Sequence, residues 1–308
     1  MATLFNTDYL LAQTKLYAAL PAGKYTDQEI LAVAYDELIS NVVPMVINLR
    51  EEFYVQSADQ NITANVSAYP IPVASLGLAV REIKIVRSNR IVDVPRMSPT
   101  DVISTQTGLP RYFYLQGNNI ILYPTPSSTV DVLRVTYYGT PEKLVVTTEA
   151  RLVTSISATL SSDGLVFCSS SDTQALGWVY DGFAENPITL SVYSGDNGHV
   201  TKGTALRNSS VSAGNLNFSG ASLTAIVAAA PLRGDWFAKD GETPLVQAPD
   251  VCFDFLCRMT AGELLQAMGD SNGYRVNSEK VKMVHDSVAS MLTNRTLGAL
   301  KKSRISIL

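Results

Sequence analysis

Residues Gly108 to Val145, GLPRYFYLQGNNIILYPTPSSTVDVLRVTYYGTPEKLV, decide the fold class because they predict consecutive antiparallel strands with clear boundaries. Tyr112 to Gln116 and Ile120 to Tyr123 are runs of aromatic and β-branched residues, which favour strands. Gly117-Asn118-Asn119 joins them, and these residue types tolerate the positive φ that a tight hairpin needs. The first two strands are therefore expected to form a hairpin.

A third strand is predicted after two prolines. Pro124 and Pro126 end the second strand, since proline has no N–H to donate to a ladder. Beyond them, Leu133, Val135 and Tyr137 alternate with polar residues, as in a sheet with one face on a core and the other in water. We expect this strand to complete a three-strand meander, a pattern that occurs in any antiparallel β domain.

Helices are predicted before this β region. Asn6 or Thr7 can cap a first helix, and Thr26 with Glu29 has the spacing of a capping box for a second. Pro44 lies inside the second helical pattern, so that helix should kink or restart there.

Two further helices are predicted near the C-terminus. Pro249 starts a pattern in which Phe253, Leu256 and Leu264 fall on one stripe. Ser278 is expected to cap a second helix, which leads to the tail of the chain. These helices are expected to pack on the N-terminal pair.

The predicted fold class is α+β, with a helical bundle from the two chain ends, an antiparallel β-sandwich or barrel, and an inserted all-β domain. The predicted segments are 1–52 for the N-terminal helices, 53–146 for the β core, 147–244 for the insert and 245–308 for the C-terminal helices and tail. A change of composition to Ser, Thr, Gly and Ala marks the insert, and Leu223 to Ala228 is one of its short β-rich pieces.

Composition and charge exclude several classes of protein. The chain has 308 residues, of which 46% are hydrophobic and 17% charged, so it can bury more than one core. Its net charge of -4 argues against wrapping nucleic acid by bulk attraction, which needs clustered Lys and Arg. No apolar run approaches the roughly 20 residues of a membrane span, and no secretion signal opens the chain. Neither membrane insertion nor secretion is expected.

The sequence offers few groups for chemistry. Cys168, Cys252 and Cys257 lack zinc-ligand spacing and are expected to be buried free thiols. His199 and His285 lack the companions of a metal or catalytic site and are expected at the surface. With no nucleophile elbow, Walker loop or dinucleotide fingerprint, we expect no catalytic residue, no cofactor and no metal.

Carboxylate pairs keep glycoside cleavage open as an alternative. Such cleavage needs two carboxyl groups at the right separation, and Glu51 with Glu52 or Asp93 with Asp101 are candidate pairs. Because the chain has 28 acidic residues, such pairs also arise by chance.

The stretch that decides the fold resembles the head-to-tail adaptor family of tailed phages, whose members are connector-ring proteins similar to tail tubular protein A. The likeness rests on structural residues, which are Gly108, Pro110, Tyr112, Phe113, Gly117, Ile120, Leu122, Pro124, Pro126, Leu133, Val135, Tyr137, Tyr138, Pro141 and Leu144. It extends backward through Thr26 to Glu29, Arg50 to Val55, Tyr69 to Pro72 and Leu78 to Val86. It covers roughly residues 5–146 and, more loosely, 249–296; the insert departs from compact members of that family.

The resemblance implies a virion structural protein, not an enzyme. It implies a dodecameric ring below the portal that joins capsid and tail around the DNA channel. The implied partners are the portal protein, a tail or nozzle protein and neighbouring copies of the same chain. DNA would pass through the channel at ejection without sequence-specific binding. The protein would be assembled in the host cytoplasm and would reside in the virion at the head-to-tail junction.

The C-terminal tail has two interpretations. Its basic and apolar residues are Lys301, Lys302, Arg304, Ile305, Ile307 and Leu308. They form either a solvated chain end or a segment that adds to a neighbouring protein, since apolar residues at an exposed end favour a partner that covers them. By resemblance that partner would be the portal ring.

Two other functions stay open at this stage. One is a β-sandwich binding module for carbohydrate or for a tail or receptor surface, with residues 149–243 as the recognition unit; exposed Trp178 and Trp236 would favour it. The other is an adaptor with muramidase activity, because some adaptors of this kind are thought to cleave the cell wall.

Overall fold

A computed structural model describes residues 5–87, 90–101, 106–129, 131–157, 159–168, 189–195, 201–212 and 215–293. The chain divides into two compact units. The first, here called the β unit, is Glu51–Thr140, and the second, the helix–insert unit, combines Met1–Arg50 with Pro141–Leu308. The fold class is α+β, as the sequence predicted.

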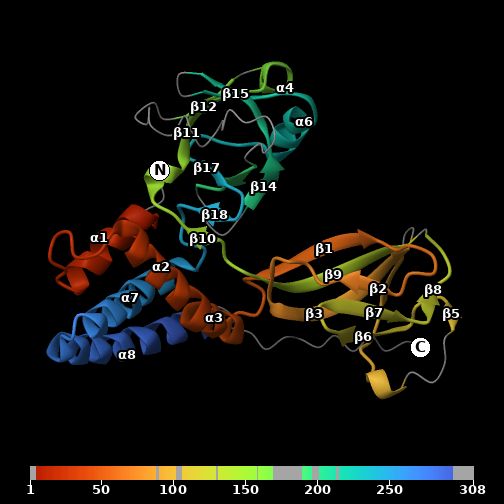
Figure 1. Ribbon diagram of the computed structural model, residues 1–308, viewed down its shortest axis with the longest axis horizontal. Helices are drawn as coiled ribbons and strands as arrows, with labels where there is room; N and C mark the ends of the chain where they lie inside the picture. Colours follow the sequence, from red (N-terminus) through yellow and green to blue (C-terminus); the bar gives the residue numbers. More distant parts are fainter. Residues whose placement is uncertain are drawn as a thin grey trace, which may run out of the picture. The chain divides into compact units, whose positions relative to one another are not determined.

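The β unit is a sandwich of two antiparallel sheets (Figure 1). The larger sheet has the order β1-β9-β3-β4 and the smaller one the order β2-β7-β6. The strands are β1 (Val55–Asn61), β2 (Ala68–Pro70), β3 (Ser75–Arg87), β4 (Arg90–Asp93), β6 (Tyr112–Gln116), β7 (Asn119–Tyr123) and β9 (Val132–Gly139). A 3₁₀ turn (Pro99–Asp101) and a parallel pair of short strands, β5 (Thr107–Gly108) and β8 (Thr125–Pro126), complete the unit.

One apolar core lies between the two sheets. Its buried residues come from both of them and from the loops beside them: Ile62, Tyr69, Ile71, Ile83, Ile85, Val94, Phe113, Ile120, Leu122, Leu133, Val135 and Tyr137. Residues at alternate positions of each strand therefore point inward, which is the arrangement of a packed sandwich.

The predicted hairpin is confirmed, but the predicted three-strand meander is wrong. β6 and β7 pair around Gly117, whose φ is +58°. β9 does not continue that sheet; it pairs with β1 and β3 in the other one. Pro124 and Pro126 end the pairing of β7. The chain next forms β8, which pairs with β5. It then continues into β9, which packs on the same core from the opposite sheet.

The helix–insert unit contains a layer of helices from both chain ends (Figure 1). They are α1 (Thr7–Tyr17), α2 (Asp27–Glu37), a π-helical turn (Leu38–Val42), α3 (Val43–Leu49), a 3₁₀ turn (Asp250–Cys252), α7 (Phe253–Ala267) and α8 (Ser271–Thr293). α7 is the central member, because α1, α2 and α8 all pack against it. The N- and C-terminal helices thus share one core, as expected.

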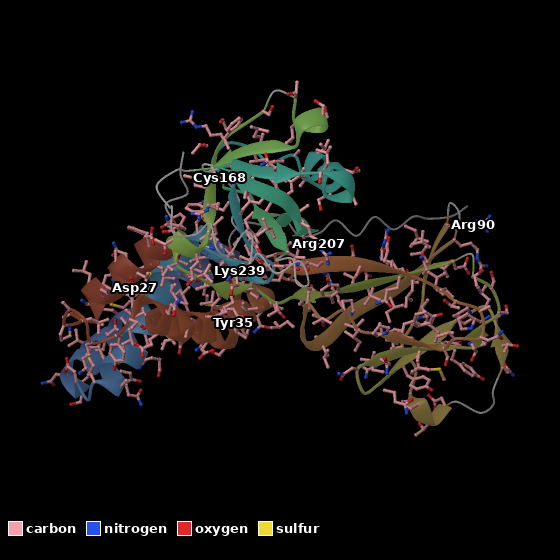
Figure 2. The ribbon with its side chains drawn as sticks, turned by 45° about the horizontal axis from the view of Figure 1, so that its top comes forward. Asp27, Tyr35, Arg90, Cys168, Arg207 and Lys239 are labelled. Atoms are coloured by element: carbon pink, nitrogen blue, oxygen red, sulfur yellow. The ribbon has the colours of Figure 1, made fainter. Side chains whose placement is uncertain are left out.

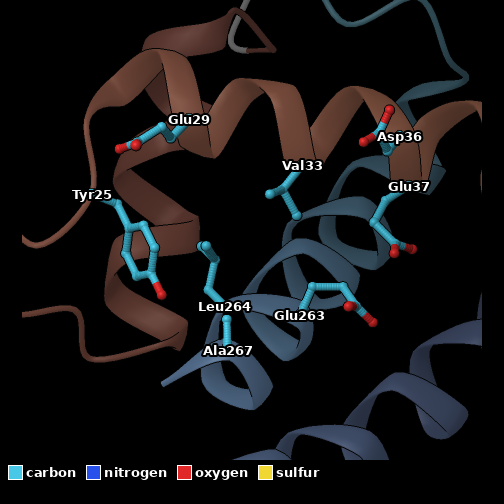
Figure 3. A pocket seen from close by; sticks show the side chains of 8 residues that line it. All are labelled: Tyr25, Glu29, Val33, Asp36, Glu37, Glu263, Leu264 and Ala267. Carbon is cyan, nitrogen blue, oxygen red and sulfur yellow. The ribbon is translucent and has the colours of Figure 1, made fainter. Parts of the chain in front are cut away.

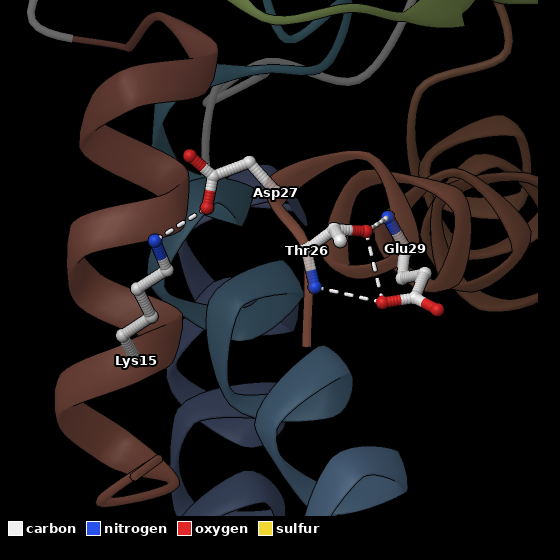
Figure 4. Close-up of polar contacts among 4 residues, drawn as sticks. All are labelled: Lys15, Thr26, Asp27 and Glu29. Carbon is white, nitrogen blue, oxygen red and sulfur yellow. Dashed lines mark hydrogen bonds and ion pairs between the residues drawn. The ribbon is translucent and has the colours of Figure 1, made fainter. Parts of the chain in front are cut away.

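The helix starts follow the predicted caps. The Asn6 side chain accepts a hydrogen bond from the Tyr9 N–H and caps α1. At α2, Thr26 and Glu29 form the reciprocal capping box, with the Thr26 N–H donating to Glu29 Oε2 at 2.7 Å (Figure 4). The predicted interruption near Pro44 is the π-helical turn, after which α3 restarts with proline in its first turn.

Two sequence expectations about helices are wrong. Ser278 does not cap a helix, because α8 already begins at Ser271 and the Ser278 hydroxyl donates to the Arg275 carbonyl within it. The continuous helical segment Asp27–Leu49 is long and apolar enough to cross a membrane by length and composition, contrary to our reading of the sequence. Half of its most apolar 18-residue window is buried inside the protein, as in the core helix of a globular layer.

The insert is built around one seven-stranded sheet of order β14-β13-β17-β11-β12-β16-β15. Its strands are β11 (Arg151–Ile156), β12 (Leu165–Cys168), β13 (Leu190–Tyr193), β14 (Thr201–Leu206), β15 (Asn208–Ser212), β16 (Asn215–Phe218) and β17 (Trp236–Lys239). Helices α4 (Leu160–Asp163) and α6 (Gly220–Ala229) accompany it.

The β-rich reading of Leu223 to Ala228 is wrong, because these residues lie in α6. Alanines, which favour helix, surround the few β-branched residues there. Ile226 is fully buried against the sheet, so packing favours the helical conformation as well.

A short parallel pair joins the insert to the helices. β10 (Lys143–Leu144) pairs with β18 (Glu242–Thr243), and the Thr7 N–H donates to the Pro244 carbonyl at 2.9 Å. Entry and exit of the insert are therefore neighbours, although its proposed boundaries at 147 and 244 remain a prediction.

Replacing residues 151–239 by a Gly/Ser linker of about six residues should leave the helical layer folded, because loop closure changes by only about 0.6 kcal/mol per doubling of length. Arg151 lies opposite Phe237 in the ladder, so the cut ends are close. Urea unfolding followed by circular dichroism should show one cooperative, somewhat weaker transition. A broad, non-cooperative transition would instead make the insert part of the same folding unit as the helices.

Candidate assembly surfaces

Helix α7 is held by different contacts on each of its sides. Toward α1, Ala18 packs against Ala261 and Leu265, and the Tyr17 hydroxyl donates to Asp254 at 2.6 Å. The Arg258 guanidinium lies 4.1 Å from the centre of the Tyr17 ring and pairs with Asp254. Toward α8, the Asn277 amide donates to the Arg258 carbonyl at 2.7 Å.

A groove of about 340 Å³ separates α2 from α7, and we call it the acidic groove. Its lining residues are Tyr25, Glu29, Val33, Asp36, Glu37, Glu263, Leu264 and Ala267. Figure 3 shows Val33 and Leu264 between the helices, with Glu37 and Glu263 near one end and Tyr25 near the other. The groove therefore has an apolar floor and a rim of carboxylates, with no basic side chain in its lining.

The negatively charged carboxylates of this groove repel one another. Burial raises the pKa of Glu37, and the negative charges of Glu263 and Asp36 raise it further. The Asn41 amide, which donates to Glu37 at 2.7 Å, acts in the opposite direction. Since like charges are held together beside apolar surface, the groove favours a cationic, partly apolar partner.

A second groove of about 430 Å³ lies between α1 and α8, and we call it the α1–α8 groove. Its lining residues are Leu16, Tyr17, Ala18, Ala19, Arg258, Leu265, Asp270, Asn272, Gly273, Val276, Asn277 and Lys280. A helix turns by about 100° per residue. Arg258 and Leu265 therefore lie on the side of α7 opposite Glu263 and Ala267, so the two grooves are on opposite sides of the layer.

The outer surface of α8 continues this second groove. Val276, Lys280, Met283 and Met291 recur at helical spacing within about a quarter of the circumference, and we call them the α8 stripe. Their apolar members, Val276, Met283 and Met291, are 49%, 73% and 48% exposed and lie near one another on the helix surface.

A buried polar cluster lies where β10 meets the insert. The Glu142 N–H donates to the Gln247 amide oxygen at 2.6 Å, and the Glu142 carboxyl interacts with the hydroxyl of fully buried Tyr193. Burial raises the pKa of Glu142 to about 7; the hydrogen bond with Tyr193 acts in the opposite direction, and the charge of Asp240 adds to the rise.

Those residues singled out from the sequence that the structure describes do not converge on a reactive centre. The tail residues Lys301, Lys302, Arg304, Ile305, Ile307 and Leu308 lie outside the described part of the chain. Glu51 accepts from the Tyr138 hydroxyl and pairs with Arg81, whereas Glu52 and Asp101 are exposed and Asp93 lies 3.9 Å from Lys84.

The cysteine and histidine expectations are met where the structure describes them. All three cysteines are buried and free, and Cys168 lies in the sheet of the insert (Figure 2). His285 is an exposed residue of α8 next to Asp286, whereas His199 lies outside the described residues.

The exposed tryptophans expected of a binding module are not found in the described part of the chain. Trp236 is only 8% exposed and packs with Tyr193 and Leu245 in a small core of the insert. Trp178 lies outside the described residues. Trp236 is buried because other parts of the insert pack against its strand. The sequence alone does not show which faces of a strand are covered in this way.

Sequence reasoning missed the grooves and the buried Glu142. Glu29 and Asp36 lie about two turns apart on α2, so an acidic helix face was visible, but Glu263 joins them only through tertiary packing. The apolar residues of the α8 stripe are visible in the sequence, but their exposure is not.

Residues 10–166 match the protein family described as SU10 adaptor protein. The match covers just over half of the chain, including the N-terminal helices, the sandwich and the first strands of the insert, and it ends before α7. No curated protein matches the chain.

The family match identifies the class of this protein as a structural phage adaptor, a component of the virion. The chain belongs to the SU10 adaptor protein family. The resemblance to phage adaptors seen in the sequence is thus confirmed at that level, while the closer likeness to connector-ring proteins such as tail tubular protein A stays a prediction.

Replacing Glu142 by Gln should flatten the pH dependence of stability. A raised pKa means that the folded state keeps a proton which the unfolded state releases near its usual value of 4.5, so stability is lost as pH rises from about 4.5 through about 7. The loss amounts to at most about 3 kcal/mol. Urea unfolding between about pH 4.5 and about pH 8 measures it.

The control for this prediction is Glu279→Gln, a change on the exposed surface of α8. It should leave the pH profile unchanged. If Glu142→Gln followed the wild-type profile, ionisation of Glu142 would not cost stability.

Proposed function

We propose that this chain is the subunit of a head-to-tail connector, a ring below the portal that joins capsid and tail around the DNA channel. The observation that carries this proposal is the family match, which spans the N-terminal helices together with the sandwich. The partners we infer are the portal protein, a tail or nozzle protein and neighbouring copies of the chain.

The role we propose is mechanical and not enzymatic. The described residues present grooves and exposed apolar helix positions on rigid helices, which suits the recognition of large surfaces. In a connector, specificity resides in such surfaces, and DNA passes through the central channel without being read. A net charge of -4 suits a channel that does not hold DNA.

The tail is our candidate for the contact with the portal. Lys302 and Arg304 are two residues apart, and so are Ile305 and Ile307, which is the spacing of side chains on one face of a strand that adds to an exposed edge. Basic residues would assist the approach at low salt, while the isoleucines would supply the buried contact.

Removing residues 301–308 should abolish binding to portal particles and leave the thermal melt unchanged, because terminal residues contribute few contacts to their own core. Replacing Ile305 and Ile307 by Asp should have nearly the same effect, since a charge in an apolar groove costs several kcal/mol unless it is paired. Co-sedimentation of each variant with portal particles is the measurement.

The matched control is Lys301→Ala with Lys302→Ala, which should weaken binding mainly at low salt. Undiminished binding by the truncated chain would assign the portal contact to another surface. Failure of the intact chain to bind portal particles under any salt condition would contradict the connector function itself.

A further inference from the structure

We propose that the acidic groove of one copy binds the α8 stripe of the next copy, so that successive subunits associate head to tail through their helical layers. This inference rests on the proposed function, because it names the contact between copies in the ring. The occupant of the acidic groove is therefore a second copy of this chain.

Charge complementarity is the first argument. The acidic groove presents the exposed carboxylates of Asp36 and Glu263, with buried Glu37 behind them, and the α8 stripe carries Lys280. None of these four residues forms an ion pair within the described part of the chain. A lysine brought to that rim would relieve the mutual repulsion of its carboxylates.

Apolar complementarity is the second argument. The floor of the groove is Val33, Leu264 and Ala267, and the stripe offers Met283 as its most exposed apolar side chain, at 73%. Methionine adapts its shape to irregular grooves, and a helix face set into an apolar groove is a common mode of recognition. Lys280 and Met283 are one turn apart, so one helix face can present both to the groove.

The placement of the two surfaces sets the symmetry of the contact. The acidic groove and the α8 stripe lie on opposite sides of α7. When the groove of one copy binds the stripe of a second copy, the stripe of the first copy and the groove of the second remain free to bind further copies. Such a heterologous contact repeats from copy to copy and closes into a ring when the rotation permits. A two-fold contact would need the groove and the stripe of each copy to face the partner at the same time, which their positions on opposite sides of the layer do not permit.

The test uses two single-cysteine variants, Glu263→Cys and Lys280→Cys, of the full chain. Both positions are exposed, so neither change should disturb the fold, and the native cysteines are buried. At high protein concentration with a mild oxidant, an equimolar mixture of the two variants should give a disulfide-linked dimer on a non-reducing gel. Each variant alone should give little.

Lys282→Cys in place of Lys280→Cys is the matched control, because it changes the same residue type on a different face of the same helix. It should not cross-link to Glu263→Cys. Equal cross-linking by this control, or absence of a linked dimer from the intended mixture, would overturn the proposal.

Charge reversal gives an independent readout. Glu263→Lys and Lys280→Glu should each lower self-association measured by sedimentation by about tenfold or more, and the variant carrying both changes should recover much of it. Loss in both single variants without recovery in the double variant contradicts direct pairing.

The outcomes separate this inference from the connector function. Rings on portal particles without the cross-link would leave the connector function intact and reject this interface. Cross-linking between copies that do not bind portal would support the interface and reject the function.

Discussion

Helix α7 must be covered on three sides, and the rest of the helix–insert unit is arranged around that requirement. Its buried residues, among them Phe255, Leu256, Ala261 and Leu264, point in directions that one neighbour could not cover. Because α1 and α2 come from the start of the chain and α8 follows α7 directly, the two ends of the sequence must meet in one layer. Removing either end would leave apolar surface of α7 in water, at a cost of roughly 25 cal/mol per Å².

This closure of the chain ends dictates how the other parts are attached. The segment between α3 and α7 leaves the helical layer and returns to it, so each part within it needs its entry and exit close together. At the insert, the β10–β18 pair performs this role, and the Thr7 hydrogen bond to the Pro244 carbonyl fixes it to the start of α1. At the β unit, β1 and the end of β9 pair antiparallel, so its first and last residues are neighbours in one ladder.

Several local signals in the sequence predicted local structure correctly, although the Ser278 cap and the strand at Leu223 to Ala228 were wrong. The Gly117 hairpin, the Thr26 capping box and the restart at Pro44 depend on neighbouring residues alone, and each is found. The partner of β9 was not predictable in this way, because the alternation of Leu133 and Val135 identifies a buried face but not the strand beside it. Partner choice depends on residues far away in the sequence.

The same limit applies to the candidate surfaces. Glu37 and Glu263 are brought together by the packing of α2 on α7, and the groove between them exists only in the folded layer. Conversely, the sequence does not reveal the environment of Met283, and only the structure shows that this apolar side chain is 73% exposed. Burial of Glu142 likewise follows from the meeting of β10 with the insert and not from its sequence neighbours.

The chemistry of the two grooves also bears on how strongly copies should associate. An exposed ion pair contributes about 0–1 kcal/mol, and a few methionine and valine contacts add only modest apolar burial, so a single contact of this kind is weak. Weak contacts become stable when many act together on a template, because each later copy binds at a high effective concentration. In the connector proposed above, a head-to-tail interface of low intrinsic strength would therefore keep free subunits apart and still close a ring once a portal had ordered them.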